Sequence, residues 1–440
     1  MKKTPINRFN GCADPEKIRS NITVRPKKIV GLSLIDPLVA SDLIERALES
    51  IYLPNDFIVS LIGDLIGRAE KYNSDLFASE ANHTNKVYYP PVAEVYPLCL
   101  TGLAGVGKSK VINALIKMMP LPQKLTTLHG ENKISSFWYT SGRGRPGPRQ
   151  LLVDLLQSDD VSGRENVRSL LVECARRANR DGVSLIILDE TQHFNTGEGL
   201  ARVTDILLNL SVLGPPIIFA TNYSLLHRLK TRNSEDRHRL LRDVRIMLPD
   251  PPGSDSWNEY VEEVLRVGAE VFELSNAQIS KELYRLTFGV KRLVVLLMKC
   301  AYLEARKSGR GKVHVDDIRR AYTSVSYSSS RVEVELLHRA AIGGQSCLKP
   351  DLRCPFDLPE SYLADVGKLS REDRDAKVWQ RTIQSSLSKE EKQVLAEIQP
   401  SVKVSKGSQN ASKQKGAAKP SLEDLEAAHF SLLESLSLRP

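Results

Sequence analysis

A glycine-rich segment in the first third of the chain has the residue types and spacing of a phosphate-binding loop. It is the run Gly102-Leu103-Ala104-Gly105-Val106-Gly107-Lys108-Ser109, which matches G-x-x-x-x-G-K-S. Glycines let backbone N–H groups turn inward around phosphates, and a following helix adds the positive end of its dipole. We expect Lys108 to reach the β- and γ-phosphates, Ser109 to ligate Mg²⁺ and Lys110 to belong to the same site. The pattern predicts binding of ATP and Mg²⁺.

The flanking residues favour this interpretation over an ordinary glycine-rich turn. The apolar run 95–101 predicts a strand before the loop, and residues 110–119 have helical periodicity after it. A phosphate-binding loop requires both flanks, because the strand carries the loop and the helix N-terminus faces the phosphates.

Two acidic residues follow a second apolar run, about eighty residues after the loop. Asp189 would end a strand and hold Mg²⁺, and Glu190 would polarise the attacking water. Asn222 follows a third apolar run, 217–220, where its side chain would lie between the acids and the γ-phosphate. Asn222 is also explained as a residue that ends a strand in a turn.

The elements that must position these residues change in type along the chain. Short apolar runs alternate with helical stretches between residues 95 and 248, which predicts an α/β fold with a parallel sheet. Only helical periodicity follows the breaker run 249–253, so we expect a small helical lid. The expected divisions are a helical N-terminal module (1–90), the α/β nucleotide domain (91–252), the lid (253–326), an extension of unassigned fold (327–400), and a flexible linker with a short amphipathic helix (401–440).

The N-terminal module and the terminal helix have open roles. The module's helical runs, 38–52 and 57–76, fit either a packing cap on the nucleotide domain or a surface for a partner. Residues 401–419 have almost no bulky apolar side chain, so we expect a disordered tail segment there. The periodic run 421–438 suits docking in a partner's groove.

Composition limits the classes of function. The chain of 440 residues has 62 Lys and Arg against 53 Asp and Glu, a net charge of +9, which suits a nucleic acid partner and also fits many proteins without one. The six cysteines form no C-x-x-C pair, which argues against a zinc site or a disulfide framework. We find no apolar window long enough to span a bilayer, and we expect a cytoplasmic protein.

The motifs in this order resemble the AAA+ ATPases over about residues 90–325. Within that class the chain looks most like the transposition regulators of the TnsC and TniB type, relatives of the Mu B protein and IstB. The cues are the loop L-T-G-x-x-G-V-G-K-S, the segment S-L-I-I-L-D-E-T-Q-H-F (184–194) and F-A-T-N (219–222).

The resemblance implies further site residues. In such proteins an arginine of a neighbouring subunit completes the site, and Arg237, Arg239 and Arg242 lie where that arginine would be expected; one or more of them could instead lie on a solvated helix face. Arg292, in the G-x-x-R run 289–292, resembles the lid residue that senses the γ-phosphate from the same subunit. An arginine supplied in trans would make hydrolysis depend on assembly.

The resemblance also implies partners. Related regulators form rings or filaments on duplex DNA, recruit a transposase and respond to a target-selection protein, in the bacterial cytoplasm at the nucleoid. Here the loop 141–149 carries Arg143, Arg145 and Arg149 in a Gly/Pro frame, which suits contact with DNA phosphates. An ordinary exposed connection between a strand and a helix explains the same loop.

Two other functions fit the same motifs. A remodelling AAA+ ATPase of the clamp-loader, initiator or helicase-loader type differs in output and not in site chemistry, and an unfoldase would need an aromatic pore loop. The aromatic run 137–139 is the one suspect for such a loop, although strand packing explains part of it. An adaptor that binds ATP without hydrolysing it would not need Glu190 beside Asp189.

Overall fold

The structure is a computed structural model that describes residues 5–90, 94–127, 130–144, 147–156, 166–194, 200–344, 348–386 and 388. The chain divides into two compact units, Met1–Lys377 and Val378–Pro440. The expected linker 401–419, the expected helix 421–438 and Arg145 lie outside the described residues. All elements that position the expected site belong to the first unit.

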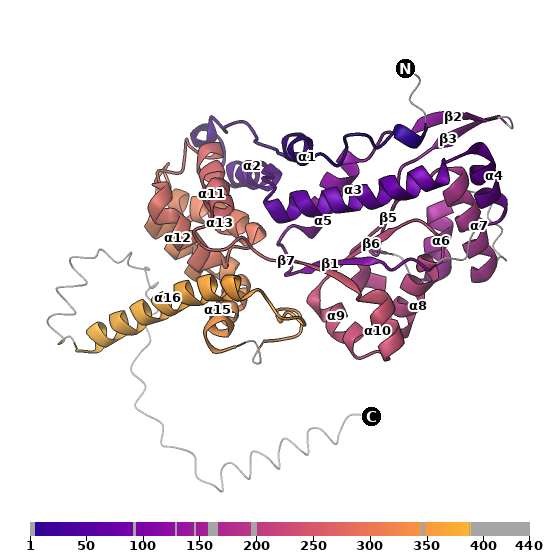
Figure 1. Ribbon diagram of the computed structural model, residues 1–440. Helices are drawn as coiled ribbons and strands as arrows, with labels where there is room; N and C mark the ends of the chain where they lie inside the picture. Colours follow the sequence, from indigo (N-terminus) through magenta and orange to yellow (C-terminus); the bar gives the residue numbers. More distant parts are fainter. Residues whose placement is uncertain are drawn as a thin grey trace, which may run out of the picture. The chain divides into compact units, whose positions relative to one another are not determined.

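Five parallel strands form the main sheet, in the order β4-β5-β6-β1-β7 (Figure 1). They are β1 (Leu98–Gly102), β4 (Trp138–Ser141), β5 (Ile186–Asp189), β6 (Ile217–Thr221) and β7 (Asp243–Met247). The strands β1, β5 and β6 are buried along their whole length, which is why each is a continuous apolar run. The parallel sheet with its helices confirms the expected α/β class, and its five carboxyl ends meet at one edge, where ligands bind in such folds.

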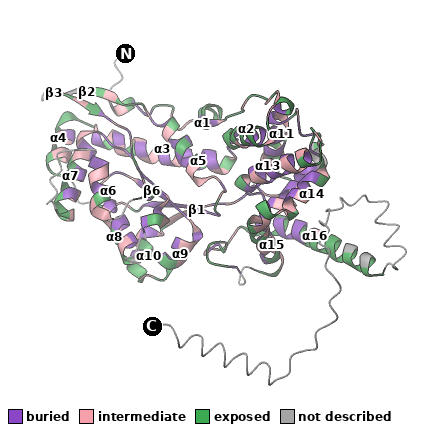
Figure 2. Cartoon of the chain, turned by 180° about the vertical axis from the view of Figure 1, so that it is seen from behind, coloured by how far each residue is buried: buried purple, intermediate pink, exposed green. Residues whose placement is uncertain are grey.

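Helices cover both faces of this sheet. Along β5, Ile187 packs in a cluster with α1 (Pro15–Ile22), α3 (Asp56–Leu76) and α5 (Lys108–Met118), whereas Leu188 packs in a second cluster on the opposite face. The second cluster contains α6 (Pro148–Leu156), α7 (Val167–Arg180), α8 (Leu200–Ser211), α9 (Tyr223–Lys230) and α10 (Ser234–Leu240). Figure 2 shows the result as bands of buried and exposed residues along the helices.

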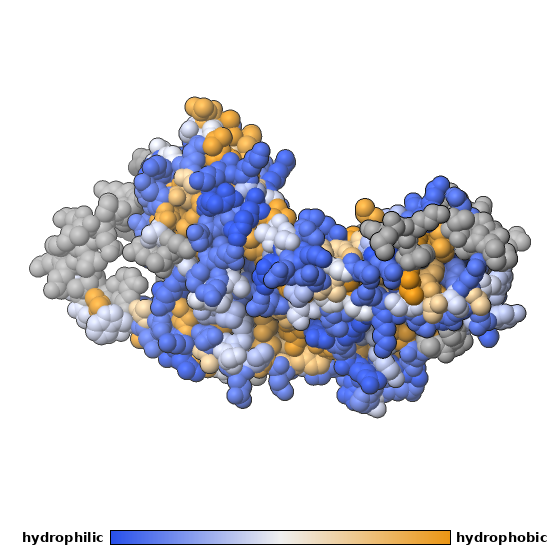
Figure 3. All heavy atoms as spheres, turned by 45° about the horizontal axis from the view of Figure 1, so that its top comes forward, coloured by the Kyte–Doolittle hydropathy of each residue, from blue (hydrophilic) through white to orange (hydrophobic). Residues whose placement is uncertain are grey.

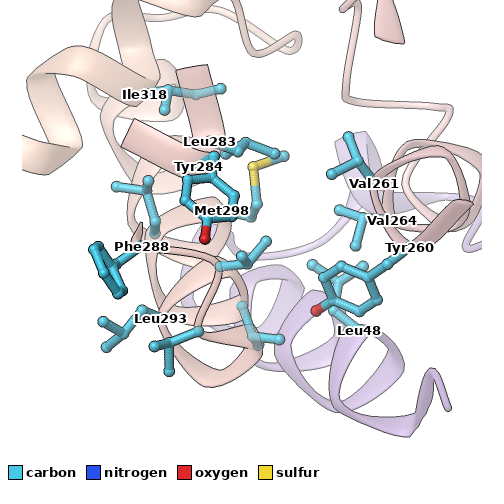
Figure 4. Close-up of a cluster of buried hydrophobic side chains, with 14 of the residues drawn as sticks. Leu48, Tyr260, Val261, Val264, Leu283, Tyr284, Phe288, Leu293, Met298 and Ile318 are labelled. Carbon is cyan, nitrogen blue, oxygen red and sulfur yellow. The ribbon is translucent and has the colours of Figure 1, made fainter. Parts of the chain in front are cut away.

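The lid is helical. It contains α11 (Asp255–Val267), α12 (Asn276–Thr287), α13 (Lys291–Lys307) and α14 (Val315–Thr323). Helix α2 (Pro37–Ser50), from the N-terminal region, packs against it, and Figure 4 shows Leu48 beside Tyr260, Val261 and Val264 of α11. Helices α1 and α3 pack on the sheet and α2 packs on the lid, but Leu38, Val39 and Leu43 of α2 are exposed, so burial within the chain accounts for only part of the apolar surface of this region.

The sequence patterns did not predict several elements. They include the small helices α1 and α4 (Glu80–Tyr88) and an antiparallel hairpin of β2 (Gln123–Thr127) and β3 (Gly130–Ile134). The extension contains α15 (Ser328–Gly343) and α16 (Glu360–Ser386), and it contributes Leu337, Leu348 and Tyr362 to the cluster of the lid. Short 3₁₀ turns occur at Pro5–Asn7, Leu32–Leu34, Thr191–Phe194 and Val325–Tyr327.

The outward sides of these elements are largely polar. Hydrophilic residues cover most of the face drawn in Figure 3, with hydrophobic side chains between them in smaller groups. Over the described residues, no helix is both long enough and apolar enough to cross a membrane.

Candidate nucleotide-binding site

The phosphate loop has a backbone that only glycine adopts easily. Gly105 and Gly107 have φ of +82° and +116°, in the left-handed region. A Cβ on Gly102 would lie 2.3 Å from the carbonyl oxygen of Met247 at the end of β7. Each glycine of the motif is therefore required by its own geometry, and the loop joins β1 to the N-terminus of α5 as the motif predicts.

Lys108 is folded over this loop. Its Nζ donates hydrogen bonds to the carbonyl oxygens of Gly102 and Leu103 at 2.9 and 3.0 Å. Burial lowers the pKa of Lys108 to about 8; the nearby carboxylates of Glu190 and Asp189 act in the opposite direction. The ammonium is thus an incompletely solvated cation at the place where phosphates would bind.

The two acids lie at the end of β5 and differ in environment. Asp189 is buried, and its Oδ1 accepts a hydrogen bond from the backbone N–H of Glu190 at 2.8 Å. Glu190 has a φ of +53°, an uncommon conformation for a side chain of this size, so its carboxylate leaves the strand direction. A Cβ on Gly142 would lie 2.4 Å from the Glu190 carbonyl oxygen, which brings the loop after β4 against this turn.

Three polar side chains surround the Glu190 carboxylate. Arg143 Nη2 lies 3.0 Å from Oε1, Gln192 Nε2 donates to Oε2, and His193 Nε2 lies 3.5 Å from Oε2. Arg143 comes from the loop for which DNA contact is expected, and the site had not been expected to include it. Arg149 lies in the first turn of α6 and does not line the cavity described below.

Asn222 and Arg292 reach the loop from two other elements. Asn222 follows β6 and is the N-cap of α9, because its Oδ1 accepts a hydrogen bond from Leu225 N at 3.2 Å. It therefore ends the strand in a turn and also lies at the site. Arg292 is the second residue of α13; its backbone N–H donates to Gly105 O at 3.4 Å, and its side chain lies against Gly105.

Most of these residues line one cavity of about 560 Å³. Its lining includes Ala104 to Lys110, Asp189, Glu190, Asn222 and Arg292, together with Arg143. It also includes residues that the sequence patterns did not single out: Ile51, Tyr52, Leu53, Tyr260, Lys291 and Val295. Lys110 donates from Nζ to the carbonyl oxygens of Glu49 and Ile51, which ties α5 to the segment between α2 and α3.

The three arginines expected to act in trans lie away from this cavity. Arg239 pairs with Glu94 at 3.2 Å and Glu235 at 2.8 Å, Arg242 lies over the Tyr96 ring at 4.5 Å, and Arg237 is exposed. None of them is among the described residues that line the cavity.

The aromatic run 137–139 is mostly packed. Trp138 is buried in β4, and Phe137 packs against the cluster on the α3 face, whereas Tyr139 is 43% exposed. Strand packing therefore accounts for Phe137 and Trp138, and a pore loop made of all three residues is not what the structure contains.

Comparisons with known proteins agree with this geometry. Residues 95–229 match the family model described as an AAA domain, a class of nucleotide-hydrolysing ATPases. No curated protein matches the chain. The chain is similar in structure to the Aeropyrum pernix ORC2 protein in its ADP form (13% identity, TM-score 0.38, covering 61% of this chain and 73% of that one).

Two more solved structures show the same level of likeness. They are Drosophila ORC bound to DNA (14% identity, TM-score 0.42, 76% of this chain and 80% of that one) and the Thermotoga maritima RuvB Holliday junction branch migration motor (13%, 0.33, 63% and 75%).

Proposed function

We propose that this chain is a Mg²⁺-dependent ATPase of the AAA+ class. One observation carries the proposal: Lys108, the adjacent pair Asp189 and Glu190, Asn222 and Arg292 come from four separate places in the sequence and line a single cavity. An adaptor that only binds ATP would need the loop and the lysine. It would not need a second acid turned out of its strand beside Asp189.

The residues divide the chemistry between them. The loop N–H groups and Lys108 would hold the phosphates, and Glu190 would orient and polarise the attacking water, with Asn222 beside it. Ser109 and Asp189 would hold Mg²⁺, since hydroxyl and carboxylate oxygens are ligands that this ion prefers. Among the described residues, no group of three or more His, Cys, Asp or Glu is placed to hold a metal ion. When bound, Mg²⁺ neutralises charge on the phosphates.

The base would contact the apolar residues of the cavity lining. Ile51, Leu53 and Val295 offer apolar surface there, and Tyr260 offers a ring. These residues come from the α2–α3 connection and from the lid, so a nucleotide would contact the sheet, the N-terminal region and the lid together.

Hydrolysis by the purified chain tests this proposal. With Mg²⁺, the wild type should release phosphate from ATP, and EDTA should stop the release. Glu190→Gln should bind ATP and fail to hydrolyse it, whereas Lys108→Ala should fail to bind. Equal turnover by Glu190→Gln and the wild type would refute the assigned role of Glu190.

We further propose that the ATPase is a DNA-binding regulator of transposition that assembles on duplex DNA, marks a target site and recruits a transposase. Support comes from the motif resemblance, the net charge of +9 and the position of Arg143 on a loop at the site. Arg237, Arg239 and Arg242 are candidates for the arginine supplied by a neighbouring subunit.

Imaging in negative stain separates this function from a remodelling ATPase. We expect rings or filaments on duplex DNA with ATP or a non-hydrolysable analogue and none without nucleotide. Nucleotide-dependent rings that form without DNA would instead support the remodelling function. Deletion of residues 420–440 should abolish transposase recruitment and leave ATPase activity and DNA binding intact. Unchanged recruitment would show that this segment does not bind the transposase.

A further inference from the structure

A buried carboxylate lies where the sheet, the N-terminal region and the lid meet. Asp250 is 4% exposed and belongs to the breaker run between β7 and α11. Its Oδ1 accepts a hydrogen bond from Asn55 Nδ2 at 2.7 Å, and its Oδ2 lies 3.0 Å from Lys291 Nζ. A buried carboxylate needs such partners, because an unpaired charge in the interior is strongly unfavourable.

Each partner of Asp250 begins a helix. Asn55 is the N-cap of α3, where its Oδ1 accepts from Ile58 N at 3.0 Å, and only Pro54 separates it from the cavity-lining residues Ile51 to Leu53. Lys291 is the first residue of α13. The carboxylate therefore joins two helix starts across the hinge between sheet and lid.

The residue after Lys291 is the one that contacts the phosphate loop. The Arg292 side chain lies against Gly105, and its backbone N–H donates to Gly105 O at 3.4 Å. Tyr260 packs on the same turn, with its ring 5.2 Å from Lys291 Nζ and its hydroxyl donating to Lys291 O at 3.5 Å. Fixing the Lys291 side chain thus fixes the first turn of α13, and with it the position of Arg292.

We propose that Asp250 is a positioning residue that holds Arg292 at the phosphate loop by pairing with Lys291. Asp250 touches neither nucleotide nor metal in this scheme; it acts through α13. The inference rests on the proposed ATPase function and deepens it, because it names what sets the lid arginine in place.

Nucleotide affinities of the purified full chain test this inference. We would measure dissociation constants for ADP and for a non-hydrolysable ATP analogue by calorimetry in the wild type, Arg292→Ala and Asp250→Asn. Arg292 is expected to contact the γ-phosphate, which ADP lacks. Both variants should therefore bind the ATP analogue roughly tenfold more weakly or worse, which corresponds to the loss of one hydrogen bond to a charged group. Their ADP affinity should stay close to that of the wild type.

A second buried acid of the lid provides the control. Asp317 is fully buried and pairs with Arg310 and Arg320, and it does not line the cavity. Asp317→Asn should therefore lower the melting temperature of the chain and leave the ratio of the two affinities unchanged. Asn55→Ser, which keeps a capping oxygen for α3 and removes the hydrogen bond to Asp250 Oδ1, should change the two affinities in the same direction as Asp250→Asn and serves in its place if that variant does not fold.

The outcomes distinguish a failure of the positioning role of Asp250 from a failure of the proposed ATPase function. Loss of ADP and analogue affinity to the same extent in Asp250→Asn, or no loss of either, would overturn the positioning role. Failure of the wild type to bind either nucleotide would instead refute the proposed function itself.

Discussion

The guanidinium of Arg143 lies against the carboxylate of Glu190, with Nη2 3.0 Å from Oε1. The arginine side chain is 71% exposed and the glutamate side chain 23%, so this ion pair lies at the mouth of the site. Glu190 is the residue expected to polarise water, and Arg143 belongs to the loop expected to meet DNA. A phosphate that attracts Arg143 would therefore compete with Glu190 for it.

The first prediction concerns this pair. Arg143→Ala should raise ATP hydrolysis without DNA by up to about fivefold, since an exposed pair contributes roughly 0.2–1 kcal/mol. It should also remove any stimulation by duplex DNA. The matched control is Arg176→Ala, an exposed arginine on α7 that does not line the cavity. Steady-state phosphate release with and without DNA measures both effects, and a lower basal rate in Arg143→Ala would contradict the competition.

The second prediction concerns protons and Lys108. Because its pKa is about 8, about half of the Lys108 side chains are neutral near pH 8. Bound phosphates stabilise the charged form and raise this pKa, so nucleotide binding at pH 8 should take up about half a proton. Affinity for the nucleotide should fall as the pH rises above 8, because binding must then protonate a lysine that is mostly neutral in the free chain.

Calorimetry in buffers of different ionisation enthalpy measures this uptake. Lys108→Arg, whose guanidinium does not titrate near pH 8, should show none of it. Uptake of the same size in Lys108→Arg would assign the proton to another group.

The third prediction uses two glycines with similar backbones. Gly105 and Gly309 have φ of +82° and +73°. A Cβ on Gly105 would lie 2.7 Å from Arg292 Nε, whereas a Cβ on Gly309 would meet nothing within 4 Å. Alanine at either position should lower the free energy of unfolding by about 1–2 kcal/mol through backbone strain.

Only Gly105→Ala should also weaken nucleotide binding, because it displaces Arg292 and narrows the loop. Denaturant unfolding together with a nucleotide titration separates strain from displacement. If Gly309→Ala lost nucleotide affinity to the same degree, the loss could not be assigned to the site.

The fourth prediction concerns pH and the extension. The His338 ring on α15 is bonded at both nitrogens, to Ser370 Oγ at 2.8 Å and to Arg285 O at 3.0 Å. Burial lowers its pKa to about 4 from the ordinary value of 6.5. Between these values the unfolded chain binds a proton that the native chain does not, so the free energy of unfolding should fall as the pH decreases from 6.5 to 4.

The loss is at most about 3 kcal/mol for a shift of this size. Thermal unfolding at pH 7 and pH 5 should show it, and the difference between the two should shrink in His338→Gln. An unchanged difference in that variant would assign the acid sensitivity elsewhere.

The strands and the phosphate loop could be predicted from local sequence, because neighbouring residues specify each of them. The run before Gly102 is apolar throughout and is buried throughout as β1, and the loop needs glycine at positions that the motif fixes. The strand begins at Leu98 rather than at residue 95, because Tyr96 is exposed and Pro97 has no N–H to donate to a neighbouring strand. The parallel order then brings Asp189 and Asn222 to one edge of the sheet, as chain order predicts.

Contacts between distant segments could not be read from local patterns. Asp250 looked like part of a breaker run, and only the structure shows that it pairs with Lys291 and Asn55. Ile51 and Tyr52 formed the end of an expected helical run, although both follow the end of α2 and line the cavity. The hairpin of β2 and β3 is polar, so it lacked the alternation that identifies a half-buried strand.

The most direct test of the central claim is the affinity of Glu190→Gln for duplex DNA, measured by fluorescence anisotropy with ATP, with ADP and without nucleotide. This variant should hold ATP unhydrolysed, so the account predicts tight DNA binding with ATP and weak binding in the other two conditions. Equal DNA affinity in all three conditions, or none in any, would contradict an ATP-dependent DNA-binding function.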